Sequence, residues 1–160
     1  MNKGAKLLGH PIHQMLIPFP LGLLAMAVIF DVIRLVNGSV ALGTSAYYMI
    51  AAGVISGLVA AVFGFIDWLT IPPRTRAKSI GVLHGLGNVA VVVLFAASWW
   101  IRRSDPGNPP SVAVVVAVVG AGLALVTGWL GGELVDRLGI GVDEGAHPDA
   151  PSSLSGQPAR

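Results

Sequence analysis

The chain has 160 residues, of which 54% are hydrophobic and 11% are charged, and it contains no cysteine. This composition excludes an ordinary soluble domain and is typical of a membrane protein. The lack of cysteine excludes disulfides, thiolate metal sites, protein-held iron–sulfur clusters and covalent c-type haem. The net charge of +2 does not indicate nucleic-acid binding, because the basic residues flank apolar segments and lie beside no aromatic reading surface.

Residues 1–15 are predicted to form an interfacial segment that carries the motif His10-Pro-Ile-His13. Pro11 suits the first position of a helix, where its missing N–H would be unpaired anyway. The motif therefore predicts His10 and His13 three residues apart on one helix face, able to converge on one ligand. Pro18 and Pro20 follow within two turns and predict a disturbed helix there.

Four long apolar segments follow, and each is 21 to 25 residues long. A bilayer core of about 30 Å needs about 20 apolar helical residues, so each segment is long enough to span it. The segments lack the alternation of barrel strands, and in lipid their backbone must be satisfied internally. The predicted fold is therefore all-α, an integral membrane four-helix bundle within residues 16–142. Its predicted helices are 16–36, 47–71, 80–101 and 112–135.

The connections between these segments are short and rich in Gly, Pro and Asn, so neighbouring helices are expected to be antiparallel. Small residues recur at helix-contact spacing, as in Gly53 with Gly57 and Gly128 with Gly132. Such residues let helix backbones approach closely in lipid, which predicts a compact bundle and is compatible with a homo-oligomer. Residues 143–160 are too polar to build a core and are predicted to be a disordered cytoplasmic tail.

The distribution of basic residues predicts the orientation in the membrane. With four spans, both termini and the second connection share one face. That face carries seven basic residues: Lys3, Lys6, Arg74, Arg76, Lys78, Arg137 and Arg160. The opposite face carries only Arg34, Arg102 and Arg103. The excess of positive charge predicts a multi-pass protein of the bacterial inner membrane with both termini in the cytoplasm.

Five polar side chains gather at the predicted cytoplasmic ends of the helices: His10, His13, His84, Asp67 and Glu133. Asn88 follows His84 by one helical turn and shares its face. Polar groups near hydrocarbon are costly and are usually functional. Each residue also has an ordinary interpretation, because histidines can cap helix ends and carboxylates can mark the water boundary.

Other polar residues are expected to be of less interest. His147 lies in the tail, and Asp31 and Arg34 are predicted to form a local surface pair three residues apart. Each helix pair has a histidine near its start and a carboxylate near its end, which is compatible with a duplicated hairpin. The spacings, 54 residues from His13 to Asp67 and 49 from His84 to Glu133, are unequal and make this a weak argument.

The motifs together resemble a known family. They are His10-Pro-Ile-His13-Gln-Met-Leu-Ile-Pro-Phe-Pro-Leu-Gly22, Phe63-Gly-Phe-Ile-Asp67-Trp, His84-Gly-x-x-Asn88 and Gly128-Trp-Leu-Gly-Gly-Glu-Leu-Val135. The chain resembles the bacterial membrane family DUF2231, which is named for lacking a known function. Gln14 stands where the family pattern often has a second proline, which removes no candidate ligand. Some relatives carry a fused Rieske-type iron–sulfur domain, so the resemblance implies electron transfer with a separate redox partner for this chain.

The leading hypothesis is a b-type haem protein that moves electrons within the membrane, between a quinone and a redox protein. Facing helices of a bundle commonly hold cofactors, and imidazole is a standard axial ligand of haem. His13 and His84 are the predicted ligands, with His10 as a substitute for His13. Asn88, Asp67 and Glu133 would orient the imidazoles or relay protons.

Two other hypotheses remain open. His10, His13 and His84, with Asp67 or Glu133, would suit Zn or non-haem Fe and could support transport or hydrolysis. Alternatively, the chain is a structural or assembly protein without a cofactor, whose polar residues stabilise the bundle through hydrogen bonds between helices.

Overall fold

The computed structural model describes residues 4–155 and 157, and within them the long elements are all helices. In chain order the elements are β1 (Lys6–Leu7), β2 (His10–Pro11), α1 (Ile12–Leu16), α2 (Pro18–Asn37), α3 (Val40–Thr70), α4 (Arg76–Ile101), α5 (Ser111–Gly132) and the π-helical turn η1 (Glu133–Arg137). Four helical spans, of which α1 with α2 and α5 with η1 each make one, are long and apolar enough to cross a membrane. The predicted four-helix membrane bundle is confirmed.

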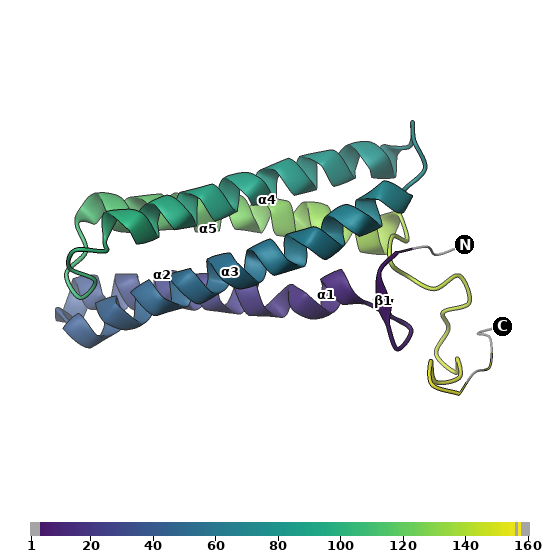
Figure 1. Cartoon of the computed structure of the whole chain (residues 1–160), viewed down its shortest axis with the longest axis horizontal. Helices are drawn as coiled ribbons and strands as arrows, with labels where there is room; N and C mark the ends of the chain where they lie inside the picture. The colour runs from purple at the N-terminus through teal and green to yellow at the C-terminus, as the bar shows by residue number, and fades with distance from the viewer. Residues whose placement is uncertain (1–3, 156, 158–160) are drawn as a thin grey trace.

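The bundle consists of two helical hairpins, α2 with α3 and α4 with α5 (Figure 1). The hairpins meet through contacts of α3 with α4 and of α5 with α2, so α2 lies diagonally opposite α4. The segment β1, the connection from α3 to α4 and the chain after η1 all lie at one end of the bundle. This arrangement brings residues at the starts of α1 and α4 to the same end, which is called the histidine end below.

Local sequence sets where the helices begin and end. Gly38 ends α2 in the left-handed conformation, with φ of 70°, and Ser39 then caps α3 by accepting a hydrogen bond from the backbone N–H of Leu42. Thr75 caps α4 in the same way through the N–H of Lys78. The helices α3 and α4 therefore begin before the apolar segments 47–71 and 80–101 that the sequence predicts.

The first span starts differently from its prediction. Pro11 is the residue before α1 and is extended, with φ of −68° and ψ of 122°, and His10 pairs with Leu7 in the short β1–β2 ladder. The prediction that His10 and His13 share a helix face is therefore wrong. The prediction of a disturbed helix is confirmed, since Ile17 separates α1 from α2 and Pro18 has no N–H to continue the ladder.

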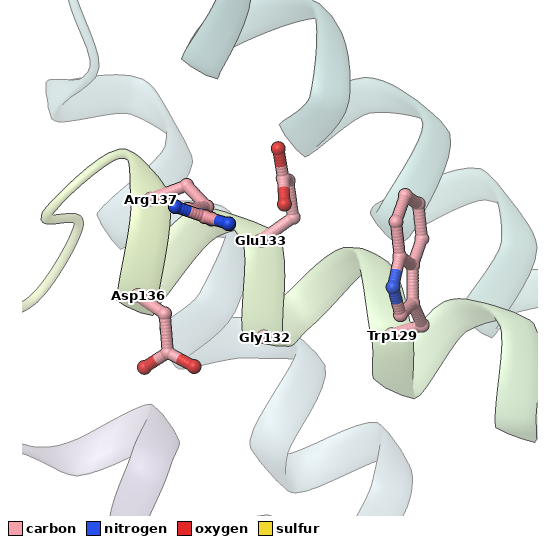
Figure 2. Close-up of a pocket in the computed structure, with 5 residues that line it drawn as sticks. All are labelled: Trp129, Gly132, Glu133, Asp136 and Arg137. Carbon is pink, nitrogen blue, oxygen red and sulfur yellow. The ribbon is translucent and has the colours of Figure 1, made fainter.

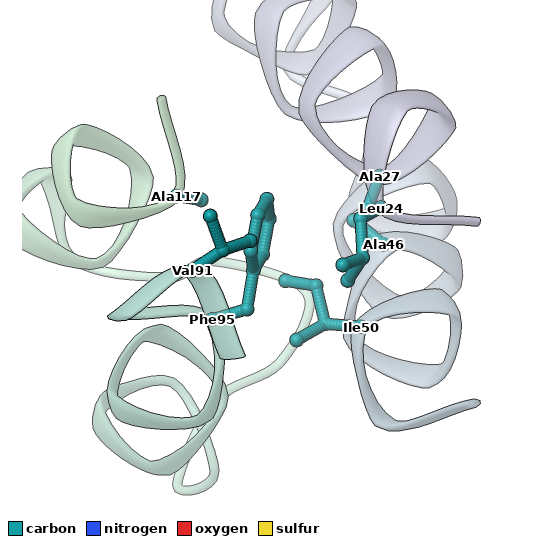
Figure 3. Close-up of a cluster of buried hydrophobic side chains, with 7 residues drawn as sticks. All are labelled: Leu24, Ala27, Ala46, Ile50, Val91, Phe95 and Ala117. Atoms are coloured by element: carbon teal, nitrogen blue, oxygen red, sulfur yellow. The ribbon is translucent and has the colours of Figure 1, made fainter. Parts of the chain in front are cut away.

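Small and apolar side chains fill the middle of the bundle (Figure 3). The buried cluster comprises Leu24, Ala27, Ala46, Ile50, Val91, Phe95 and Ala117. The outward faces of the helices carry exposed apolar side chains such as Leu58, Val93 and Leu125, which are 54%, 60% and 76% exposed. Apolar side chains on both the inner and outer faces are the pattern of helices surrounded by lipid.

The end of the bundle opposite the histidines contains a fully buried ion pair. The guanidinium of Arg102 donates from Nη1 and Nη2 to both carboxylate oxygens of Asp31, at 2.9 and 2.8 Å, and both side chains are 0% exposed. Arg34 instead donates to the carbonyl oxygen of Gly107 at 2.7 Å. The prediction of a local pair between Asp31 and Arg34 is wrong, because the partner of Asp31 comes from the other hairpin.

The chain after η1 forms turns with no regular element among its described residues. It lies against the N-terminal segment, where Ser153 Oγ is 3.3 Å from Nε2 of His10. The predicted disorder of residues 143–160 stays a prediction. Two of the basic residues used for the orientation, Lys3 and Arg160, are outside the described residues.

Close contact between α2 and α3 depends on Gly53. A Cβ at Gly53 would lie 2.6 Å from Cδ2 of Leu24, whereas a Cβ at Gly122 would meet nothing within 4 Å. We expect Gly53→Val to destabilise the bundle by about 1–3 kcal/mol through overpacking. Gly122→Val is the matched control, because it adds the same β-branched residue to a helix at an open position. Thermal unfolding in detergent micelles should separate the two variants, and equal midpoints would contradict this packing.

Candidate functional site

Two imidazole rings face each other at the histidine end of the bundle. The ring of His13 comes from α1 and the ring of His84 from α4, so they meet across the diagonal of the bundle. Their centroids are 6.4 Å apart and their planes are nearly perpendicular, at 87°. Both side chains are half-buried. The structure thus brings together the two histidines that the sequence predicted as ligands.

Each imidazole is held by a hydrogen bond to the backbone of the next span, which is α3 for His13 and α5 for His84. Nδ1 of His13 lies 2.8 Å from the carbonyl oxygen of Ala60, and Nδ1 of His84 lies 2.9 Å from the carbonyl oxygen of Thr127. A carbonyl oxygen can only accept, so each Nδ1 must carry the proton. A neutral ring then has its Nε2 lone pair free to accept a hydrogen bond or to bind a metal ion.

A glycine lies beside each ring, one turn after the carbonyl that holds it. A Cβ at Gly64 would be 2.8 Å from Cε1 of His13, and a Cβ at Gly131 would be 3.1 Å from Cε1 of His84. A larger residue at either position would press on the imidazole. The two glycines therefore create the space in which the rings lie.

Asn88 completes the surroundings of His84. Its amide nitrogen donates to the carbonyl oxygen of His84 at 2.9 Å and lies 3.2 Å from Nε2 of the same ring. Its amide oxygen accepts from the hydroxyl of Thr127 at 3.1 Å. The same amide nitrogen is 3.4 Å from Nδ1, so it lies over the face of the ring and not in line with the Nε2 lone pair.

The other three predicted site residues do not join the histidine pair. His10 is exposed on β2 beside Ser153. Asp67 accepts the backbone N–H of Ala5 at 2.8 Å and so ties the N-terminal segment to the end of α3. Glu133 forms an ion pair with Arg76 of α4.

Glu133 also lines a shallow hollow of about 340 Å³ at the end of α5 (Figure 2). Its lining residues are Trp129, Gly132, Glu133, Asp136 and Arg137, and neither histidine is among them. The side chains of Glu133 and Asp136 point in opposite directions from η1, so the two carboxylates do not converge. The hollow is a surface feature beside the histidine pair rather than part of it.

The predicted metal cluster is not assembled within the described part of the chain. There, no group of three or more His, Asp or Glu side chains is close enough together to hold a metal ion. Of the glycines near His84 in α4, Gly81 packs against Trp68 and Gly87 against Thr127, while Gly85 faces open space. Close helix packing thus explains two of these three glycines.

Comparison with protein families now adds to this geometry. The family described as "Predicted membrane protein (DUF2231)" matches residues 9–144, which is most of the chain and includes both histidines and both hairpins. The chain belongs to the DUF2231 family. The resemblance in the motifs is thereby confirmed. Searches of curated proteins and of solved structures found no match.

Sequence reasoning missed the groups that hold the DUF2231 histidine pair. The carbonyls of Ala60 and Thr127 have no sequence motif, because any residue can supply a backbone oxygen. The signal that could have found them is the pair of glycines, since Gly64 follows His13 by 51 residues and Gly131 follows His84 by 47. The buried partner of Asp31 was missed for another reason, as Arg102 was counted as a loop charge.

The backbone hydrogen bonds predict the tautomers of the two histidines. In ¹⁵N NMR of the histidine-labelled protein in micelles above neutral pH, His13 and His84 should be protonated at Nδ1. Gly64→Ala should shift the signals of His13, and Gly131→Ala those of His84, because each added methyl group meets the ring. Gly128→Ala is the control, since a Cβ there meets nothing within 4 Å. Nε2-protonated rings at both positions would contradict the geometry.

Proposed function

We propose that this DUF2231 protein binds one b-type haem between His13 and His84 and transfers electrons within the membrane, with a quinone or a separate redox protein as partner. The observation that carries the proposal is the facing pair of imidazoles on diagonal helices. Cofactors of helix bundles are held by side chains from facing helices in this way, and imidazole is a usual axial ligand of haem iron.

The separation of the rings supports a role for both histidines in holding one haem. Imidazole nitrogen binds metal ions at about 2.0–2.1 Å, so two imidazoles on opposite sides of one ion have centroids roughly 6 Å apart. The centroids of His13 and His84 are 6.4 Å apart. The distance between the rings is thus compatible with both imidazoles holding one group.

The hydrogen bonds support the same role. Metal-binding histidines usually donate their other ring N–H to a carbonyl or carboxylate, which fixes the tautomer and the ring orientation and raises the basicity of the ligand. Ala60 and Thr127 supply such carbonyls. Because no cysteine is present, the group would be held without covalent attachment, as in a b-type protein. When bound, haem would supply one-electron chemistry.

The divalent-metal hypothesis has less support. It requires three imidazoles and a carboxylate, but His10 lies away from the histidine pair and Glu133 is engaged by Arg76. Two imidazoles alone are too few protein ligands for an ordinary zinc site. A pair of imidazoles would, however, be enough protein ligands to hold a haem.

A visible spectrum tests the proposal. The protein purified in mild detergent should show a Soret band and, after dithionite, sharp α and β bands. His13→Ala and His84→Ala should each abolish this spectrum, because each removes one of the two imidazoles that would hold the haem. His10→Ala and His147→Ala are matched controls that should leave it unchanged, and Asn88→Ala should also keep it. A colourless wild-type protein, or full haem content in His84→Ala, would overturn the proposal; a protein without haem or metal would favour a structural role.

We also propose that the histidine end faces the bacterial cytoplasm. Arg74, Arg76 and Lys78 lie in or beside the connection from α3 to α4 at that end. The connections at the other end have only Arg34, Arg102 and Arg103 in or beside them. Positive charge near short loops favours the cytoplasmic side. A C-terminal green fluorescent protein fusion should therefore fluoresce, and a C-terminal alkaline phosphatase fusion should be inactive. An active phosphatase fusion would contradict this orientation.

A further inference from the structure

Residues of the first and third spans correspond at a constant separation of 71 positions. His13 corresponds in this way to His84, and both rings lie at the histidine end. Further corresponding pairs, every member of which is buried, are Leu24 and Phe95, Ala27 and Ser98, and Asp31 and Arg102. One separation thus relates the inner faces of the two spans over their whole length.

The second and fourth spans correspond at a separation of 67 positions. The pairs are Ala46 and Ala113, Ile50 and Ala117, Gly53 and Gly120, Ala60 and Thr127, and Gly64 and Gly131. Within this set, Ala46, Ile50, Ala113 and Ala117 are all 0% exposed. The carboxylates noted in the sequence, Asp67 and Glu133, are 66 positions apart and so miss this correspondence by one residue. Most of the difference between their spacings from the histidines comes from the two separations, 71 and 67, which differ by four.

Contacts within each hairpin repeat at corresponding positions. The imidazole of each first helix binds the corresponding carbonyl of the second, at 2.8 Å in one hairpin and 2.9 Å in the other. The side chain of Leu24 covers Gly53, as that of Phe95 covers Gly120, with 2.6 and 3.0 Å to an added Cβ. Repeated contacts, unlike repeated residue types, show that the two hairpins share one internal packing.

Corresponding residues also meet each other across the centre of the bundle. His13 faces His84 at one end, and Asp31 binds Arg102 at the other. In both spans 18 residues separate the two positions, which is five turns of an α-helix and places them on one face. Residues that contact their own counterparts lie next to a two-fold axis, so the hairpins are related by an approximate two-fold axis along the bundle.

We propose that the two hairpins are copies of one ancestral unit, and that Asp31 and Arg102 make the inner face of each copy selective for the other. The partner of each interaction surface is thus the unlike hairpin of the same chain. If a hairpin paired with its own kind, the same axis would bury Asp31 against Asp31 or Arg102 against Arg102. Buried like charges without water strongly oppose such pairing, whereas opposite charges complete each other.

The residues around Asp31 and those around Arg102 differ in a way that suits the charge of each side chain. Ser98 accepts from Nη2 of Arg102 at 2.9 Å and donates to the carbonyl oxygen of Ala113 at 2.7 Å. The corresponding residues on the aspartate side are Ala27 and Ala46, and Ala27 has no hydroxyl. The hydroxyl is therefore present only in the copy that carries the guanidinium. There it accepts a hydrogen bond from Nη2 of Arg102.

The test exchanges the two charges in the full-length protein and measures the midpoint of thermal unfolding in detergent by loss of the monodisperse species. Asp31→Arg alone and Arg102→Asp alone should lower the midpoint by about 10 °C or more, or prevent folding, since each buries like charges. The double variant D31R/R102D should recover most of this loss. In this variant the arginine at position 31 would lie near the carbonyl oxygen of Ala46. That oxygen corresponds to the carbonyl oxygen of Ala113, which lies 3.5 Å from Nη2 of Arg102.

Moving the hydroxyl from position 98 to position 27 tests whether these two positions correspond. The exchange A27S/S98A should lower the midpoint in the native background but raise it in the D31R/R102D background, because the hydroxyl belongs beside the guanidinium. Failure of D31R/R102D to recover, or the same sign of the hydroxyl effect in both backgrounds, would overturn the proposal. These measurements do not depend on haem, so a colourless protein would leave them unaffected.

Discussion

The structure depends on one constraint, which is that a polar group inside a lipid-embedded bundle must find its partner in the protein. The polar side chains at the two ends of the bundle meet that requirement through another part of the chain, although Nε1 of Trp99 and Nε of Arg102 are buried without a partner among the described residues. The imidazoles bind carbonyls of α3 and α5, Asn88 binds Thr127, and Arg102 binds Asp31. Since an unsatisfied polar group in hydrocarbon is costly, these bonds specify which helices lie together and in what register.

The approximate two-fold axis gives the two ends of the bundle different chemistry. At one end the corresponding residues are identical, and the two imidazole rings face each other. At the other end identical residues would be two buried like charges, and there the copies have diverged to Asp31 and Arg102. The like pair forms a symmetric site suited to one ligand between two rings, and the unlike pair closes the opposite end and joins the hairpins.

Much of the fold could be predicted because hydrophobic length alone identifies membrane spans. The histidine pair was also predictable, since His13 and His84 are costly to place near hydrocarbon. Predictions of side-chain pairs failed where they assumed that residues close in sequence contact each other. Asp31 and Arg34 are three residues apart and suggested a helix-face pair, but the carboxylate binds a residue of the other hairpin. The prediction that His10 shares a helix face with His13 failed because Pro11 precedes the helix and does not begin it.

By itself the sequence determined that the chain is a four-span membrane protein with its histidines at one end, because apolar length and the cost of polar groups depend only on residue type and order. Only the tertiary structure decided which polar groups meet. It separated His13 and His84 from His10, Asp67 and Glu133, and it paired Asp31 with Arg102. Those choices depend on how the two hairpins dock, and the backbone carbonyls and small residues that control docking carry no distinctive pattern in one sequence.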